Sequence, residues 1–152
     1  MPAGQQLPVA TWDATQYVVI VTPTVGPSFR VVGPAKGTFV EVARMTDAFS
    51  SDAGANGDVV RSYNADQRGT VKLTVQQTSP SNDLLSNIGI ADEQSGKGLC
   101  ILALEDISGR SISSGASAWL KRISDGSFAV EAGDRVWEFE VAQLRHFIGG
   151  AV

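Results

Sequence analysis

Glycine and proline cut the apolar residues of this chain into many short runs, and this division restricts the fold more than any other feature. The 152 residues include 16 Gly and 6 Pro, which are spread along the whole sequence. Valine outnumbers leucine by 17 to 9, and β-branched side chains favour extended strands. The sequence therefore predicts a mainly β fold, an antiparallel β-barrel or sandwich of many short strands.

Two segments, Thr70–Gln77 and Arg135–Leu144, show the clearest alternation of a strand with one buried face. Their core-facing side chains are expected to be Val71, Leu73, Val75, Trp137, Phe139 and Val141. Further strands are predicted at Tyr17–Thr22, Phe29–Val32, Gly37–Met45, Val59–Tyr63, Leu99–Glu105, Ala118–Ile123 and Phe128–Glu131. The run Leu99–Glu105 is nearly all apolar, so we expect it to be buried on both faces or to lie under the helix.

One short α-helix is predicted to flank the sheet. Ser79 is a favoured N-cap, Pro80 suits the first helical position, and Asp83 lies at the positive end of the helix dipole. The apolar stripe of this helix consists of Leu84, Leu85 and Ile88. Gly89 is the expected end, which makes the helix a short element laid against the sheet.

A polar excursion, Arg44–Arg61, interrupts the strand pattern. Its centre is small and polar, and it contains Asn56-Gly57, a strong turn pair for a chain that doubles back. A lone barrel of this size does not need such a long connection. We therefore expect a long β-hairpin or loop, either a contact surface or a mobile surface loop.

Length, composition and charge favour one domain over residues 1–152, with residues 1–15 as an extended N-terminal arm. Hydrophobic residues make up 43% of the chain, but no run of about 18 apolar residues occurs, so we expect no membrane insertion. We also expect no secretory signal at the N-terminus. The single Cys100 fits a reducing compartment. The net charge of −4 argues against strong nucleic-acid binding.

The nucleophiles and bases of the chain form no catalytic motif. His146 is the single histidine, and no Ser or Cys motif supplies it with a nucleophile, so we interpret it as a surface or terminal-strand residue. Cys100 lies in an apolar run and is expected to be a buried, inert thiol. Strand alternation sends Glu105 and Asp106 to opposite faces. We therefore expect no enzymatic activity.

Metal and phosphate sites are also not indicated. Asp52 and Asp58 resemble part of a calcium loop, but the position of the closing glutamate is occupied by Tyr63. Gly33–Gly37 lacks the ending of a phosphate-binding loop. The three tryptophans, Trp12, Trp119 and Trp137, are not interleaved with basic residues, so we expect core or interface anchors. No cofactor and no metal are predicted.

The order of several short motifs resembles that of a known family. The motifs are Gly37–Val40, Asn56–Ser62, Asn64 with Asp66, Gly69–Val71, Thr78–Leu85, Asp106–Gly109, Ala118–Leu120, Trp137-Glu138 and Phe147–Gly150. They resemble the inner tail tube protein of contractile-tailed bacteriophages, which is related in fold to the tube proteins of type VI secretion systems and R-type pyocins. Ser79–Asp83 (Ser-Pro-Ser-Asn-Asp) is the most specific block, and the resemblance spans Tyr17–Gly150.

The resemblance implies a structural virion protein. Hexameric rings of it would stack into a hollow tube inside the contractile sheath, and genomic DNA would pass through the bore without specific binding. The implied partners are other copies of this chain, the sheath protein, and the baseplate hub and tail terminator proteins. The implied location is the virion tail, after assembly in the host bacterial cytoplasm. The acidic balance agrees with a bore that must release DNA.

Two surfaces become candidate contact sites under this interpretation. The excursion would reach the adjacent ring through Asp47, Phe49, Asp52, Asn56, Asp58 and Arg61. The helix would meet the sheath or a neighbouring copy, or simply cap the barrel, through Ser79, Asp83, Leu84 and Ile88. The alternatives are another ring component, such as a terminator, hub or secreted tube subunit, and a small ligand-binding β-sandwich.

Overall fold

The computed structural model describes residues 6–150. A 3-10 turn, Ala14–Gln16, precedes the first strand. The strands are β1 (Tyr17–Pro23), β2 (Phe29–Arg30), β3 (Val40–Arg44), β4 (Phe49–Ala53), β5 (Val59–Tyr63), β6 (Gly69–Gln76), β7 (Cys100–Asp106), β8 (Ile112–Leu120), β9 (Asp134–Val141) and β10 (Leu144–Phe147). The helix α1 (Ser81–Ser95) lies between β6 and β7.

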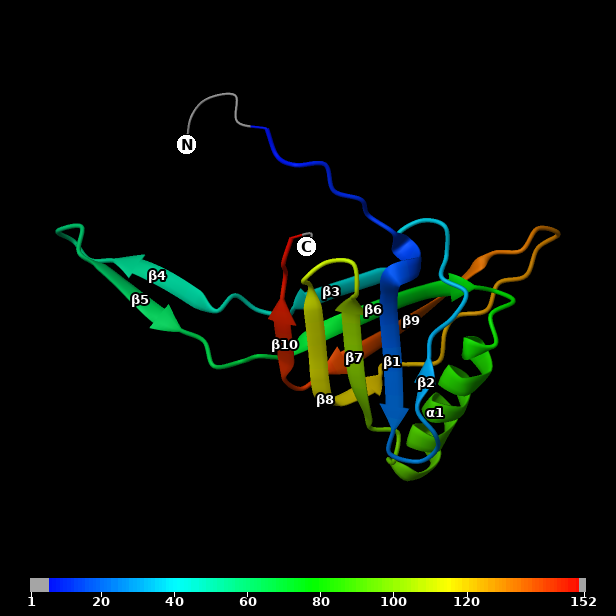
Figure 1. The fold of residues 1–152 in the computed structure, drawn as a ribbon. Coiled ribbons are helices and arrows are strands. Elements are labelled where there is room, and N and C mark those ends of the chain that lie inside the picture. The colour runs from blue at the N-terminus through cyan, green and yellow to red at the C-terminus, as the bar shows by residue number, and fades with distance from the viewer. Residues whose placement is uncertain (1–5, 151–152) are drawn as a thin grey trace.

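The predicted mainly β, antiparallel fold is confirmed, and its form is a sandwich, not a closed barrel. Eight strands pair in the order β2-β1-β7-β8-β9-β6-β3, and β10 adds to β8. Figure 1 shows β10, β8, β7 and β1 side by side, crossing the layer of β9, β6 and β3. The two end strands, β2 and β3, leave the sheet open.

Strand β8 joins the two layers. Its first half, from Ile112 to Gly115, pairs with β7 and β10, and Ala118–Leu120 pairs with β9. At the change of layer, a Cβ on Gly115 would run into the side chain of Val141. A glycine at this position therefore lets the two layers approach closely.

The core fills the space between the layers and under α1. The predicted alternation of β6 and β9 is confirmed, and their inward side chains are Val71, Leu73, Val75, Trp137, Phe139 and Val141. Burial of an apolar side chain of this size stabilises the fold by roughly 1.5–3 kcal/mol. Trp12 and Trp119, by contrast, lie outside this core.

The predicted bounds of the helix were wrong at both ends. The helix begins at Ser81, with Pro80 as its N-cap, and it continues past Gly89 to Ser95. Gly89 is buried in the middle of the helix, where a Cβ would lie 2.9 Å from Ile123 Cγ1. Close packing thus explains this glycine. The helix ends at Gly96, whose left-handed φ of 67° suits glycine.

Five strand predictions also need correction. Phe128–Glu131 is not a strand, and Arg135–Leu144 is divided, because the chain turns after Val141 and returns as β10. Leu99–Glu105 is not buried on both faces, since Leu102 and Leu104 point inward while Ile101 is half exposed. The strands predicted at Phe29–Val32 and Gly37–Met45 are shorter in the structure.

The N-terminal segment leaves the sandwich. Residues 6–13 form neither helix nor strand, and Figure 1 shows this segment extending from the body, while Ala10, Thr11 and Trp12 still line a cavity with Asp106. Residues 1–5 of the expected arm lie outside the described part of the chain. Within residues 6–150, no helix has the length and apolar character needed to span a membrane.

Candidate assembly interface

Strands β4 and β5 form a two-stranded hairpin that extends from the sandwich. Their register pairs Phe49 with Tyr63 at the base and Ala53 with Val59 near the tip. The predicted turn at Asn56-Gly57 is confirmed, with Gly57 at a positive φ of 84°. Figure 1 shows the hairpin pointing away from the body, on the side opposite α1.

Both strands of this hairpin are exposed along their whole length. The large side chains concerned include Phe49, Val59, Val60 and Tyr63. Val59 exposes 70% of its surface and Val60 exposes 65%, although they lie on opposite faces of the ribbon. Exposed apolar side chains gathered on one projecting element are typical of a contact surface.

The two faces of the hairpin differ in chemistry. One face, which we call the aromatic face, carries Phe49, Ser51, Ala53, Val59, Arg61 and Tyr63. On it the rings of Phe49 and Tyr63 lie 5.5 Å apart, and the Arg61 guanidinium stacks 4.2 Å from the Phe49 ring centroid. The other face carries Ser50, Asp52, Val60 and Ser62. The hairpin is thus amphipathic, but its own chain covers neither face.

All six residues predicted for the contact loop lie on the hairpin or its flanks, and all are exposed: Asp47, Phe49, Asp52, Asn56, Asp58 and Arg61. Sequence analysis missed Val59 and Tyr63 as surface residues of the same face. The signal for them was strand alternation, which places Val59 and Tyr63 on the same face as Arg61, whereas counting outward from Asn56-Gly57 as a two-residue turn would shift the cross-strand register by one residue. The structure places Asp52 and Arg61 on opposite faces.

The Ser-Pro-Ser-Asn-Asp block serves as an anchor between α1 and the sheet. Ser79 Oγ donates a hydrogen bond to the Val32 carbonyl at 2.6 Å, and Ser81 Oγ accepts one from the Val32 amide at 2.9 Å. Asn82 Nδ2 donates to the carbonyls of Gln76 and Gln77, and Asn82 Oδ1 accepts from Trp137 Nε1 at 2.9 Å. These bonds fix the start of the helix on the end of β6, on β9 and on the segment that follows β2.

The four residues predicted for the helix surface divide into two pairs. Ser79 and Ile88 are buried against the sandwich, whereas Asp83 and Leu84 are exposed. Beside Leu84 an apolar groove of about 300 Å³ opens between α1 and the turn that joins β1 to β2. Its walls, which define the α1 groove, include Val25, Pro27, Leu84, Asn87 and Ala91.

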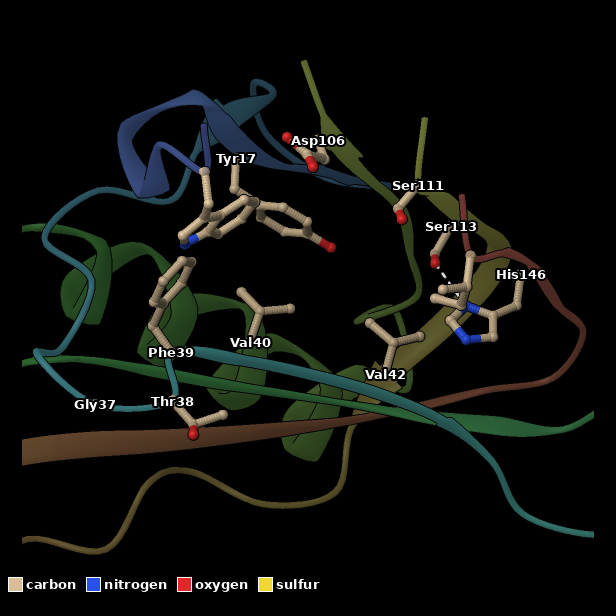
Figure 2. A pocket seen from close by; sticks show the side chains of 12 residues that line it. Tyr17, Gly37, Thr38, Phe39, Val40, Val42, Asp106, Ser111, Ser113 and His146 are labelled. Carbon is tan, nitrogen blue, oxygen red and sulfur yellow. Dashed lines mark hydrogen bonds between the residues drawn. The ribbon is translucent and has the colours of Figure 1, made fainter. Parts of the chain in front are cut away.

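A second cavity, of about 330 Å³, lies at the open end of the sandwich. Figure 2 shows Tyr17, Phe39, Val40 and Val42 around it, with His146 at the far side. Burial raises the pKa of the Tyr17 phenol, and the charge of Asp106 raises this pKa further. The cavity therefore lies between β3, which contributes Val40 and Val42, and the layer that contributes Tyr17, Ser113 and His146.

His146 lies on the last strand, β10, as predicted, and it has a serine neighbour that no sequence motif indicated. Ser113 Oγ lies 2.7 Å from His146 Nδ1, because β10 pairs with β8 in the register that places the two residues opposite each other. Asp106 lines the same cavity, but its carboxylate accepts hydrogen bonds from the amide and hydroxyl of Ser108. Burial lowers the pKa of His146, and the charge of Arg44 adds to this effect.

Cys100 is a buried, unreactive thiol, as predicted. Its side chain lies in the core, and its sulfur contacts the Ala118 carbonyl oxygen at 3.5 Å. Burial raises the pKa of the thiol to about 12, and the charge of Asp92 contributes to the rise. The reactive thiolate form is therefore scarce at neutral pH.

Three comparisons with known proteins concern the fold and the family of this chain. The fold is similar to that of the anti-feeding prophage cap (AFP tube terminating cap), with a TM-score of 0.56 at 9% identity over 95% of this chain and 97% of that chain. The sequence is 26% identical to "Structural protein ORF10" of Pseudomonas phage KPP10 over 144 residues, 93% of this chain and 83% of the relative. The family model for the bacteriophage PhiTE tail tube protein matches residues 9–149, so the chain belongs to this family of phage tail tube proteins.

Proposed function

We propose that this chain is the subunit of the inner tube of a contractile phage tail. In this proposal the protein has no catalytic role. Six copies form a ring, rings stack into a hollow tube inside the sheath, and the genome passes through the bore. Membership of a tail tube family supports the structural role.

The observation that carries this proposal is the exposed hairpin β4–β5. A two-stranded hairpin is marginally stable in water without further packing, and this one has all its strand residues exposed. A contact with another copy in an assembly would supply that packing. We place the hairpin against a different surface of the next copy, a head-to-tail contact, because this arrangement generates closed rings or open stacks.

The two outer faces of the sandwich support an orientation in the tube. On β3, β6 and β9, Glu41, Lys72 and Glu138 stand in one row across the strands, and Lys121 Nζ lies 3.3 Å from Glu138 Oε1. Paired charges of this kind do not retain DNA phosphates, so we place this face toward the bore. The opposite outer face exposes Ile20, Ile101, Ile112 and Phe147 and fits protein contacts.

The remaining partners follow from the same proposal. The sheath surrounds the tube, the baseplate hub begins it, and the terminator ends it. Assembly takes place in the host cytoplasm. A second candidate function, a terminator ring, draws support from the fold likeness to a tube-terminating cap.

Negative-stain electron microscopy of the purified protein tests the proposal. Long hollow rods of one diameter with six-fold end views are the expected result, whereas single rings that never elongate would favour the terminator. Single copies at high protein concentration, together with complete tails on particles that lack the protein, would overturn both functions.

The orientation has its own test. Replacing Glu41 and Glu138 with Gln removes the two carboxylates that stand opposite Lys72 across the strands, and with Glu138 the partner of Lys121. Tubes of this variant should bind DNA in a salt-dependent way, and unmodified tubes should not. Equal DNA binding by both would place a different face toward the bore.

A further inference from the structure

The connection between β4 and β5 carries an asparagine that is directly followed by glycine. Asn56 and Gly57 lie in the turn 54–58 at the tip of the hairpin, and both are exposed. Within residues 6–150, no hydrogen bond holds the side-chain amide of Asn56. Asparagine is one of the thermolabile residues of proteins, and an exposed loop tip is open to chemical attack.

The chemistry available to this pair is an attack of the backbone on the side chain. The Gly57 nitrogen forms a bond to Asn56 Cγ, the bond from Cγ to Nδ2 breaks, and Nδ2 leaves as ammonia with the proton of the Gly57 amide. Water then opens the five-membered ring. Opening at Cγ leaves aspartate, and opening at the main-chain carbonyl leaves isoaspartate. Glycine favours the attack because it has no Cβ to crowd the nitrogen.

The other three asparagines of the chain are protected by what surrounds or follows them. Asn64 is also exposed, but alanine follows it, and its Oδ1 accepts a hydrogen bond at 3.0 Å from the backbone amide two residues on. Asn82 is bonded at both ends of its side-chain amide in the anchor of α1. Asn87 lies inside α1, before the β-branched Ile88.

Two backbone hydrogen bonds close the turn and must open before the attack. The Gly57 amide donates to the Gly54 carbonyl at 2.9 Å, and the Gly54 amide donates to the Asp58 carbonyl at 2.8 Å. No residue of β4 or β5 is buried, so opening the tip exposes no core side chain. A two-stranded ribbon of this kind is marginally stable in water. The turn therefore slows the attack but does not prevent it.

We infer that Asn56 is a site of spontaneous deamidation, which turns it into aspartate or isoaspartate while the sandwich keeps its asparagines. Each conversion adds one negative charge to a chain of net charge −4, in a turn that already contains Asp58. The isoaspartate product also adds a methylene group to the backbone path. The two bonds that close the turn then lose their geometry.

The conversion has a consequence for assembly, and this part rests on the proposed function. Asn56 lies at the tip of the hairpin that we place against the next copy. A longer, more acidic and less ordered tip fits that contact less well, because ordering it on binding costs free energy. Converted subunits should therefore need a higher protein concentration to form tubes than unconverted ones.

Peptide mapping of soluble protein, aged in a mildly alkaline buffer, tests the site. The peptide that contains Asn56 should gain the mass of an exchange of NH₂ for OH and separate into two products, faster than the peptide that contains Asn64. Isoelectric focusing should show an acidic shift that Asn56→Gln abolishes and the matched control Asn64→Gln keeps. Glutamine is protected because its ring would need six members. Equal rates at both asparagines, or conversion of Asn56 only in urea, would overturn the site.

Assembly of aged protein tests the consequence. Aged protein should form fewer tubes than fresh protein at the same concentration, and aged Asn56→Gln protein should match its own fresh sample. Equal assembly of converted and unconverted subunits would overturn the consequence and leave the site standing. If fresh protein never forms tubes, the proposed function fails, whereas the peptide map still decides whether Asn56 deamidates.

Discussion

The sandwich and the hairpin share the same antiparallel pairing, but they bury very different amounts of side chain. In β6 every second residue is buried, whereas no residue of β4 or β5 is. A backbone hydrogen bond contributes only about 0.5–1.5 kcal/mol net, so pairing alone does not hold a two-stranded ribbon. The body of this protein supplies its own stability, whereas its own chain gives the hairpin little packing, which is consistent with the contact proposed above.

Shortening the hairpin should separate folding from assembly most sharply. Joining Asp52 to Val60, which are cross-strand partners, through Asn-Gly removes the tip and keeps the register of the remaining pairs. We expect normal thermal unfolding of soluble protein or rings, and a complete loss of tubes in the microscope. Normal tubes from the shortened chain would show that the tip takes no part in assembly.

Two phenylalanine-to-alanine substitutions, one in the sandwich and one in the hairpin, compare how much each region contributes to stability. Phe139 is fully buried on β9, so Phe139→Ala should lower the free energy of unfolding by about 3–5 kcal/mol. Phe49 is 47% exposed on the hairpin, so Phe49→Ala should change it by about 0.5 kcal/mol or less. Urea unfolding of unassembled protein measures both.

Phe49→Ala should instead weaken assembly, because it removes the ring on which Arg61 stacks. The comparison between body and hairpin would be wrong if both substitutions cost the same free energy of unfolding. It would also be wrong if Phe49→Ala assembled as well as the unmodified protein.

The buried face of a strand could be predicted from the sequence where apolar and polar residues alternate within that strand. Val71, Leu73 and Val75 alternate with polar residues, so their buried face was correctly assigned. Leu99–Glu105 gave no such alternation, because Ile101 is apolar but faces outward. Its orientation depends on pairing with β1 and β8, which are distant in sequence.

The other errors in the sequence-based predictions concern features that depend on contacts between distant segments. Gly89 has the properties of a helix end, but here its small size allows contact with Ile123. The Ser113–His146 pair depends on the pairing of β8 with β10, and β10 itself was missed as a separate strand. The hairpin was predicted from its turn, whereas the division of its residues between two faces required the register.

The anchor of α1 should behave as part of the body. Asn82→Ala removes hydrogen bonds to two backbone carbonyls and to Trp137 Nε1. We expect a loss of about 1–3 kcal/mol in the free energy of unfolding. Combining it with Trp137→Phe in a double-mutant cycle should show coupling between the two residues. Additive effects would mean that the bond between them contributes nothing to stability.

The smallest expected effect on stability concerns His146. This residue lines the same cavity as Val40 and Val42 of β3, the strand that precedes the hairpin. Burial lowers the pKa of His146 in the folded protein below its ordinary value of 6.5. Between the two pKa values the unfolded chain binds more protons, so the free energy of unfolding rises with pH through that window and levels off above about 6.5.

His146→Gln should remove this part of the pH dependence, because glutamine can still hydrogen-bond Ser113 but does not titrate. Urea midpoints of both proteins between about pH 5 and 7 measure the difference. The charge of Arg44 disfavours protonation of His146 in the folded state, so Arg44→Gln should weaken the same pH dependence without abolishing it. Identical pH slopes for all three proteins would mean that His146 titrates as it does in water, and that the open end of the sandwich is as solvated as the hairpin.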